Sequence, residues 1–94
     1  MSKKIYFNGN LYDGDTKLVS ILDRGLNFGD GLFEVVRGID GKCLLFTKHI
    51  ERMRESAQFL KMDIPYTNEE LLKAAKELAE VNQVSNGEYY FQLT

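Results

Sequence analysis

The spacing of hydrophobic and polar positions changes near residue 46, which predicts strands before this point and helices after it. In the first half, short apolar stretches are separated by glycine and polar residues, as is typical of β-strands joined by tight turns. The clearest strand pattern covers residues 32–39. Further strands are expected at residues 5–7, 10–12, 18–22, 42–46 and 88–94.

Glycine-containing pairs mark the turns between these strands. Asn8-Gly9 and Asp40-Gly41 provide the positive φ angles that a two-residue hairpin turn requires. Residues 23–31 contain three glycines, so we expect a loop there that bends sharply or approaches another group closely.

Apolar residues in the second half recur at spacings of three and four, which predicts two amphipathic helices. Thr47 is expected to cap the first helix, and Thr67 with Glu70 forms a capping-box pattern at the start of the second. The apolar face of the first helix consists of Phe46, Ile50, Met53, Ala57 and Leu60. The inner face of the second helix consists of Leu71, Ala74, Ala75, Leu78 and Asn82.

Together these elements predict an α+β fold, in which an antiparallel sheet of hairpins carries two helices packed on one side. The last strand pattern is rich in aromatic residues and has no polar tail. Because an uncovered aromatic strand favours aggregation, we expect the chain to be the N-terminal part of a longer protein.

The strand over residues 32–39 has two mixed faces. Alternation places Phe33, Val35 and Arg37 on one face. Glu34 and Val36 lie on the other face, so each face combines a charge with apolar side chains. A partly buried, partly polar cavity is one arrangement that satisfies both faces.

Composition limits the class of protein. The 94 residues are 44% hydrophobic with a net charge of -2, which indicates one globular domain and argues against a dedicated nucleic-acid-binding protein. A single Cys provides no disulfide framework and no Cys cluster for a metal. No apolar run approaches the roughly 20 residues that span a bilayer, and there is no signal-peptide pattern. We therefore expect a cytoplasmic protein without nucleic-acid or membrane partners.

Known nucleotide-binding motifs do not explain the glycine-rich segment. Gly29 and Gly31 begin a dinucleotide fingerprint, but Glu34 replaces its third glycine and a strand follows where that motif requires a helix. The phosphate-binding P-loop pattern does not occur. We interpret Cys43 as a small buried hydrophobe and His49 as a structural hydrogen-bonding residue. No catalytic residue and no metal site are assigned.

Arg52 lies to one side of the apolar face of the first helix, next to His49 and Ser56. Lys48, four positions earlier, repels Arg52 unless an anion offsets the two charges, and Glu55 partly neutralises it from three positions later. The spacing alone leaves both a solvated arginine and an anion site open.

Several ordered blocks resemble the N-terminal domain of class IV pyridoxal-phosphate enzymes. That family includes D-amino-acid aminotransferases, branched-chain aminotransferases and aminodeoxychorismate lyases. The resemblance covers essentially the whole chain. The blocks are residues 23–37, Asp40-Gly41-Lys42, His49-Ile50-Glu51-Arg52-Met53, Ile64-Pro65-Tyr66-Thr67 and Tyr90-Phe91-Gln92-Leu93-Thr94.

The resemblance implies roles for four residues. Arg52 matches the family arginine that binds the cofactor phosphate, and a guanidinium suits that task because it donates paired hydrogen bonds. Phe33 matches a residue that lines the active site, where D-amino-acid members typically carry Tyr. Val35 and Arg37 would continue this substrate-binding wall. Arg37 would either attract a substrate carboxylate or form a structural ion pair.

The resemblance also implies a function for the whole protein. A homodimer would use pyridoxal 5'-phosphate to transfer an amino group between an amino acid, D- or branched-chain, and a 2-oxo acid. The family lysine that bonds to the cofactor matches no Lys of this chain, so we expect the chain to lack the C-terminal domain and to be inactive alone. Two alternatives are the N-terminal domain of an aminodeoxychorismate lyase and a stand-alone domain that binds an anion or a partner.

Overall fold

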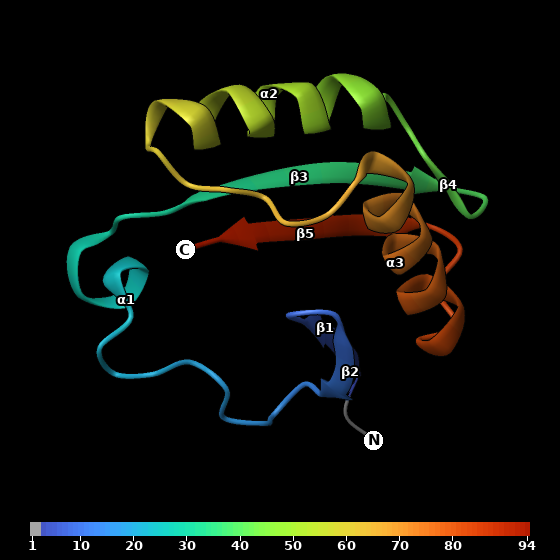
Figure 1. Ribbon diagram of the computed structural model, residues 1–94. Helices are drawn as coiled ribbons and strands as arrows, with labels where there is room; N and C mark the ends of the chain where they lie inside the picture. The colour runs from blue at the N-terminus through green and yellow to red at the C-terminus, as the bar shows by residue number, and fades with distance from the viewer. Residues whose placement is uncertain (1–2) are drawn as a thin grey trace.

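The computed structural model describes residues 3–94 and has an α+β fold, as the sequence predicts (Figure 1). Its strands form an antiparallel pair, β1–β2, and a three-stranded antiparallel sheet with the order β4-β3-β5. The strands are β1 (Lys4–Phe7), β2 (Asn10–Asp13), β3 (Leu32–Ile39), β4 (Lys42–Cys43) and β5 (Gly87–Leu93). The helices are α1 (Arg24–Phe28), α2 (Phe46–Phe59) and α3 (Asn68–Val81).

Both predicted hairpin turns are confirmed. Asn8 and Gly9 have φ angles of 48° and 87°, and Asp40 and Gly41 have φ angles of 51° and 74°. Two successive positive φ angles match the right-handed twist of the strands that they join. The first turn connects β1 to β2, and the second connects β3 to β4.

β3 is the central strand of the larger sheet and pairs with β5 along most of its length. In this register the Cα of Phe33 faces that of Gln92, and the Cα of Val35 faces that of Tyr90. The rings of Phe33 and Tyr90 stack with centroids 5.4 Å apart on one face of the sheet. Period-two alternation directs Glu34 and Val36 to the opposite face, where both are buried.

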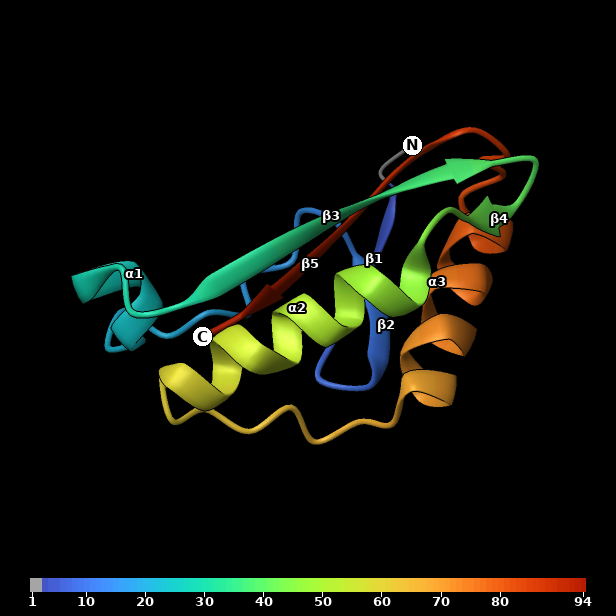
Figure 2. The ribbon, with the colours of Figure 1, turned by 90° about the horizontal axis from the view of Figure 1, so that it is seen from above.

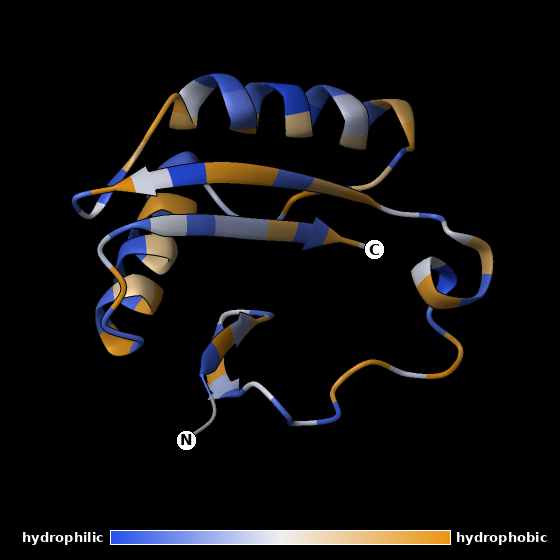
Figure 3. Ribbon diagram, turned by 180° about the vertical axis from the view of Figure 1, so that it is seen from behind, coloured by the Kyte–Doolittle hydropathy of each residue, from blue (hydrophilic) through white to orange (hydrophobic). Residues whose placement is uncertain are grey.

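α2 packs against that second face of β3 and forms the main core (Figures 1 and 2). Val36 of β3 and Ile50 of α2 are both fully buried, and Met53 and Ala57 continue the buried stripe. Burial of a side chain such as Ile50 stabilises the fold by about 1.5–3 kcal/mol. Figure 3 shows hydrophobic positions of α2 turned toward the sheet and hydrophilic ones turned outward.

α3 contacts β1, and its C-cap residue Asn82 forms hydrogen bonds with the N-terminal hairpin. The side chain of Asn82 accepts a hydrogen bond from the Lys4 backbone N–H at 2.7 Å and donates one to the Lys4 carbonyl at 2.9 Å. At its other end, α3 has the predicted capping box between Thr67 and Glu70. The helices therefore contact different sheets, which the single predicted sheet did not anticipate.

The segment before β3 differs from the prediction. Residues 18–22 form no strand, and Ile21 and Leu22 are 79% and 78% exposed. The predicted loop over residues 23–31 contains the short helix α1. It forms because one carboxylate oxygen of Asp23 accepts hydrogen bonds from the backbone N–H groups of Gly25 and Leu26.

The start of α2 also differs from the prediction. The N-cap position is Leu45, with a φ of 53° and no side-chain cap, so the prediction that Thr47 caps the helix is wrong. The strand expected over residues 42–46 ends at Cys43, because a turn follows and α2 begins at Phe46. Among the described residues, no helix is long and apolar enough to cross a membrane.

Candidate functional site

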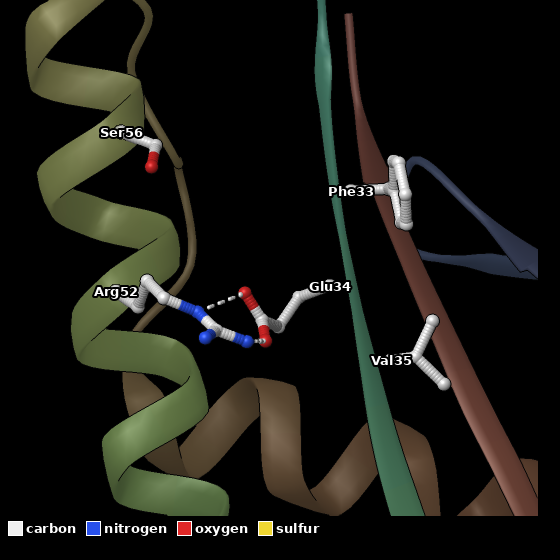
Figure 4. A pocket seen from close by; sticks show the side chains of 5 residues that line it. All are labelled: Phe33, Glu34, Val35, Arg52 and Ser56. Atoms are coloured by element: carbon white, nitrogen blue, oxygen red, sulfur yellow. Dashed lines mark hydrogen bonds and ion pairs between the residues drawn. The ribbon is translucent and has the colours of Figure 1, made fainter.

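An open cavity of about 360 Å³ lies between α2 and the part of the β3 edge that β4 leaves unpaired. It is lined by Phe33, Glu34, Val35, Arg52 and Ser56 (Figure 4). Figure 4 shows Arg52 and Glu34 pointing toward each other on the α2 side of β3, while Phe33 and Val35 project from the other side. The cavity therefore extends around the strand edge, since β4 pairs with β3 only at Gly38 and Ile39.

A buried carboxylate holds the only arginine of this cavity. Arg52 donates from Nε to Oε2 of Glu34 at 3.1 Å, and from Nη2 to Oε1 of the same residue. Two parallel bonds of this kind fix both the position and the plane of a guanidinium. Glu34 is 5% exposed, whereas the side chain of Arg52 is 68% exposed.

His49 supplies a third contact to the same carboxylate. Its Nδ1 lies 2.6 Å from Oε1 of Glu34. Because an ionised carboxylate only accepts hydrogen bonds, the histidine proton in this contact resides on Nδ1. This finding agrees with the structural role expected for His49. One turn of helix places His49 and Arg52 on the same side of α2.

Glu34 and Arg52 each stabilise the charged form of the other. Hydrogen bonds from the Arg52 guanidinium hold the pKa of Glu34 below its usual value, against the opposing effect of burial, and His49 adds to the lowering. The hydrogen bonds to Glu34 in turn raise the pKa of Arg52. Glu34 and Arg52 are therefore both ionised at neutral pH.

The remaining donors of Arg52 fit an anion such as a phosphate group. A guanidinium carries five N–H groups, and Glu34 engages one on Nε and one on Nη2, which leaves three for another acceptor. Ser56, one turn later on α2, adds a hydroxyl to the same cavity. The arrangement provides a fixed cation, free donors and an opening to solvent.

The structure brings together three of the four residues that the resemblance pointed to. Phe33, Val35 and Arg52 line the cavity, but Arg37 does not. Arg37 is an exposed residue farther along β3, opposite Glu88 of β5. Phe33 is 60% exposed and presents a ring without a hydroxyl.

Sequence reasoning did not identify Glu34 as the partner of Arg52 and considered Glu55 instead. The available signal was that Glu34 shares a strand face with Val36. A charge on a face that packs against an apolar helix must find a partner there. Ser56, noted only as a neighbour of Arg52 on the helix, also proves to line the cavity.

Cys43 lies outside this cavity. It is half-buried rather than fully buried, and burial raises the pKa of its thiol above the usual value. Tyr89 partly offsets this rise in the pKa of the thiol. Within residues 3–94, no group of three or more His, Cys, Asp or Glu side chains is placed to hold a metal ion.

Comparisons with known proteins show the family to which the chain belongs. The family model for amino-transferase class IV matches residues 31–94, a range that includes every residue lining the cavity. The chain belongs to the class IV aminotransferase family. Among curated relatives, a D-alanine aminotransferase of Staphylococcus haemolyticus is 43% identical over 91 residues, and one of Listeria monocytogenes is 38% identical over 91 residues.

Solved structures show the same fold. A branched-chain aminotransferase of Thermoproteus uzoniensis, solved with norvaline, superposes with a TM-score of 0.82 at 32% identity over 98% of this chain. The T.th. branched-chain amino acid aminotransferase, complexed with N-(5'-phosphopyridoxyl)-L-glutamate, gives a TM-score of 0.88 at 26% identity and equal coverage. The chain spans 32% of the length of both structures and of both curated relatives named above.

Proposed function

We propose that this chain is the phosphate-binding N-terminal domain of a pyridoxal 5'-phosphate-dependent aminotransferase. The observation that carries the proposal is the guanidinium of Arg52, fixed by Glu34 with three N–H donors unengaged beside an open cavity. Arg52 would bind the cofactor phosphate, with the Ser56 hydroxyl as a second donor. When bound, pyridoxal phosphate supplies an electron sink for the amino-group transfer.

The remaining cavity residues have a different task in this proposal. Phe33 and Val35 would form an apolar wall that excludes water and contacts the side chain of the substrate. Arg37 would attract a substrate carboxylate only if another part of the protein closes over this end of β3. The five cavity residues include no lysine, so we propose that the chain alone does not catalyse transfer.

The longer protein would transfer an amino group between an amino acid and a 2-oxo acid, as a homodimer whose C-terminal domain carries the reactive lysine. Relatives named D-alanine aminotransferase reach 43% identity, which favours a D-amino acid. A second candidate is a branched-chain amino acid, supported by the 32% identity to the branched-chain aminotransferase of Thermoproteus uzoniensis. A donor assay of the longer protein with L- and D-amino acids, and with aminodeoxychorismate, distinguishes these substrates and the lyase reaction.

The test of phosphate binding is Arg52→Ala in the longer protein. We expect pyridoxal phosphate to be retained at least about tenfold less tightly, because a charge-assisted bidentate contact is lost. Arg54→Ala is the matched control, because Arg54 lies on α2 but donates to Asn68 and to the Tyr66 carbonyl. Equal cofactor affinity in the parent protein and the Arg52 variant would contradict the proposal.

A further inference from the structure

The orientation of the Arg52 guanidinium is set by a residue from another element. Its side chain is 68% exposed, and an exposed arginine normally samples many rotamers. The carboxylate of Glu34 is 5% exposed and lies on β3, which is the central strand of its sheet. The two hydrogen bonds from Nε and Nη2 therefore restrict the rotamers of the Arg52 side chain by joining it to Glu34.

Glu34 is itself fixed by more than its strand. His49 donates to Oε1, the oxygen that also accepts from Nη2 of Arg52, and leaves Oε2 to the Nε contact. All the hydrogen-bonding groups that meet the carboxylate come from one face of α2. The carboxylate can rotate only by breaking at least one charge-assisted bond.

We propose that Glu34, with His49 behind it, is a positioning residue that presets the Arg52 guanidinium for phosphate. This inference rests on the proposed function and adds a role for a residue that acts through Arg52. The two bonds occupy the Nε–Nη2 edge of the guanidinium and leave Nη1 and the second Nη2 hydrogen for the phosphate. Binding then orders no further torsion of the arginine, so its entropic cost is smaller.

The sign of one substitution separates this role from a purely electrostatic one. A carboxylate next to an anion site lowers the local positive potential. Charge alone therefore predicts that Glu34→Gln strengthens phosphate binding. Positioning predicts the opposite, because the amide of Gln offers one acceptor oxygen and turns an NH₂ group toward the guanidinium.

The experiment is a titration of this 94-residue chain with inorganic phosphate, followed by NMR of the arginine Nε–Hε groups. In the parent chain we expect a restrained Arg52 signal that shifts on addition of phosphate. In Glu34→Gln we expect a less restrained Arg52 signal and binding weakened by about three- to tenfold, the scale of ordering one long side chain. Glu55→Gln is the matched control, since it removes the same charge three positions from Arg52, whereas the hydrogen bonds of Arg52 within the described residues go to Glu34.

A second pair of variants keeps the test decisive if Glu34→Gln does not fold. His49→Leu removes the support of the carboxylate, and we expect a smaller loss of phosphate affinity and of Arg52 restraint. His49→Asn should restore both, because its amide N–H can replace the Nδ1 donor.

Two outcomes overturn the inference, and they are distinguishable. If Arg52 of the parent chain does not respond to phosphate, the phosphate-binding role fails and the positioning role fails with it. If Arg52 responds but Glu34→Gln, or His49→Leu, binds phosphate as tightly as the parent or more tightly, only the positioning role is wrong.

Discussion

Phe33 and Arg52 lie on opposite sides of β3 and line the same cavity (Figure 4). Phe33 projects from the face that it shares with Tyr90, whereas Arg52 reaches from α2 to the other face. Both meet at the β3 edge because β4 ends after two residues and leaves this part of the strand unpaired. A short edge strand thus gives one cavity an apolar wall and a cation.

Glu34 should make the stability of the chain depend on acidic pH. The pKa of Glu34 is lower in the folded chain than its usual 4.5. The contribution of the ionised carboxylate to the free energy of unfolding is therefore complete at pH values above about 4.5. It is then lost as the pH falls from about 4.5 through the lowered pKa. Urea unfolding at a series of pH values should show that the free energy of unfolding falls less on acidification in Glu34→Gln than in the parent chain. At neutral pH this variant should be about 1–3 kcal/mol less stable.

Glu55→Gln provides the control for that pH series. Glu55 is exposed and should leave the acid dependence of the parent chain unchanged. Identical acid profiles for Glu34→Gln and the parent would contradict the assignment of the ion pair.

Thr67 and Thr47 provide a matched pair for helix capping. Thr67→Ala removes the hydroxyl that accepts from the Glu70 N–H, so we expect a loss of about 1 kcal/mol. Thr47→Ala should change the free energy of unfolding by less than about 0.5 kcal/mol, because the N-cap of α2 is Leu45. Chemical denaturation of both variants measures the difference. Equal losses in the two would show that the capping assignment is wrong.

Asn82 should stabilise the contact between α3 and the N-terminal hairpin. Asn82→Ala removes both hydrogen bonds to the Lys4 backbone, and we expect a cost of about 1–3 kcal/mol. Amide hydrogen exchange should accelerate in β1 and β2 more than in β3. Glu80→Ala, at an exposed position of α3, is the control and should leave the exchange of the hairpin unchanged. Unchanged hairpin protection in the Asn82 variant is the contradicting result.

Cys43 should react slowly with alkylating reagents at neutral pH. Burial raises the pKa of its thiol above 9.0, so the reactive thiolate is scarce at neutral pH. The rate of iodoacetamide labelling, followed by mass spectrometry, should rise only at pH values above about 9 and should increase on unfolding in urea. Labelling of the folded chain at neutral pH as fast as that of the unfolded chain would contradict this assignment.

Local sequence signals predicted the features whose causes are local. The hairpin turns follow from the φ preferences of Asn8-Gly9 and Asp40-Gly41, and the capping box follows from Thr67 and Glu70. The buried face of α2 follows from the spacing of its apolar residues. Local signals failed at residues 18–22, because β propensity without a pairing strand does not make a strand.

The sequence by itself determined the hairpin turns, the two faces of β3, the buried stripe of α2 and the family resemblance. The tertiary structure decided which charge meets that arginine, since Glu34 and Arg52 are 18 positions apart on different elements. It also separated Arg37 from the cavity, although alternation places Arg37 on the same face as Phe33 and Val35. Spacing along the chain fixes the face of a side chain. Only the packing of α2 against β3, and the early end of β4, fix where a cavity opens on that strand.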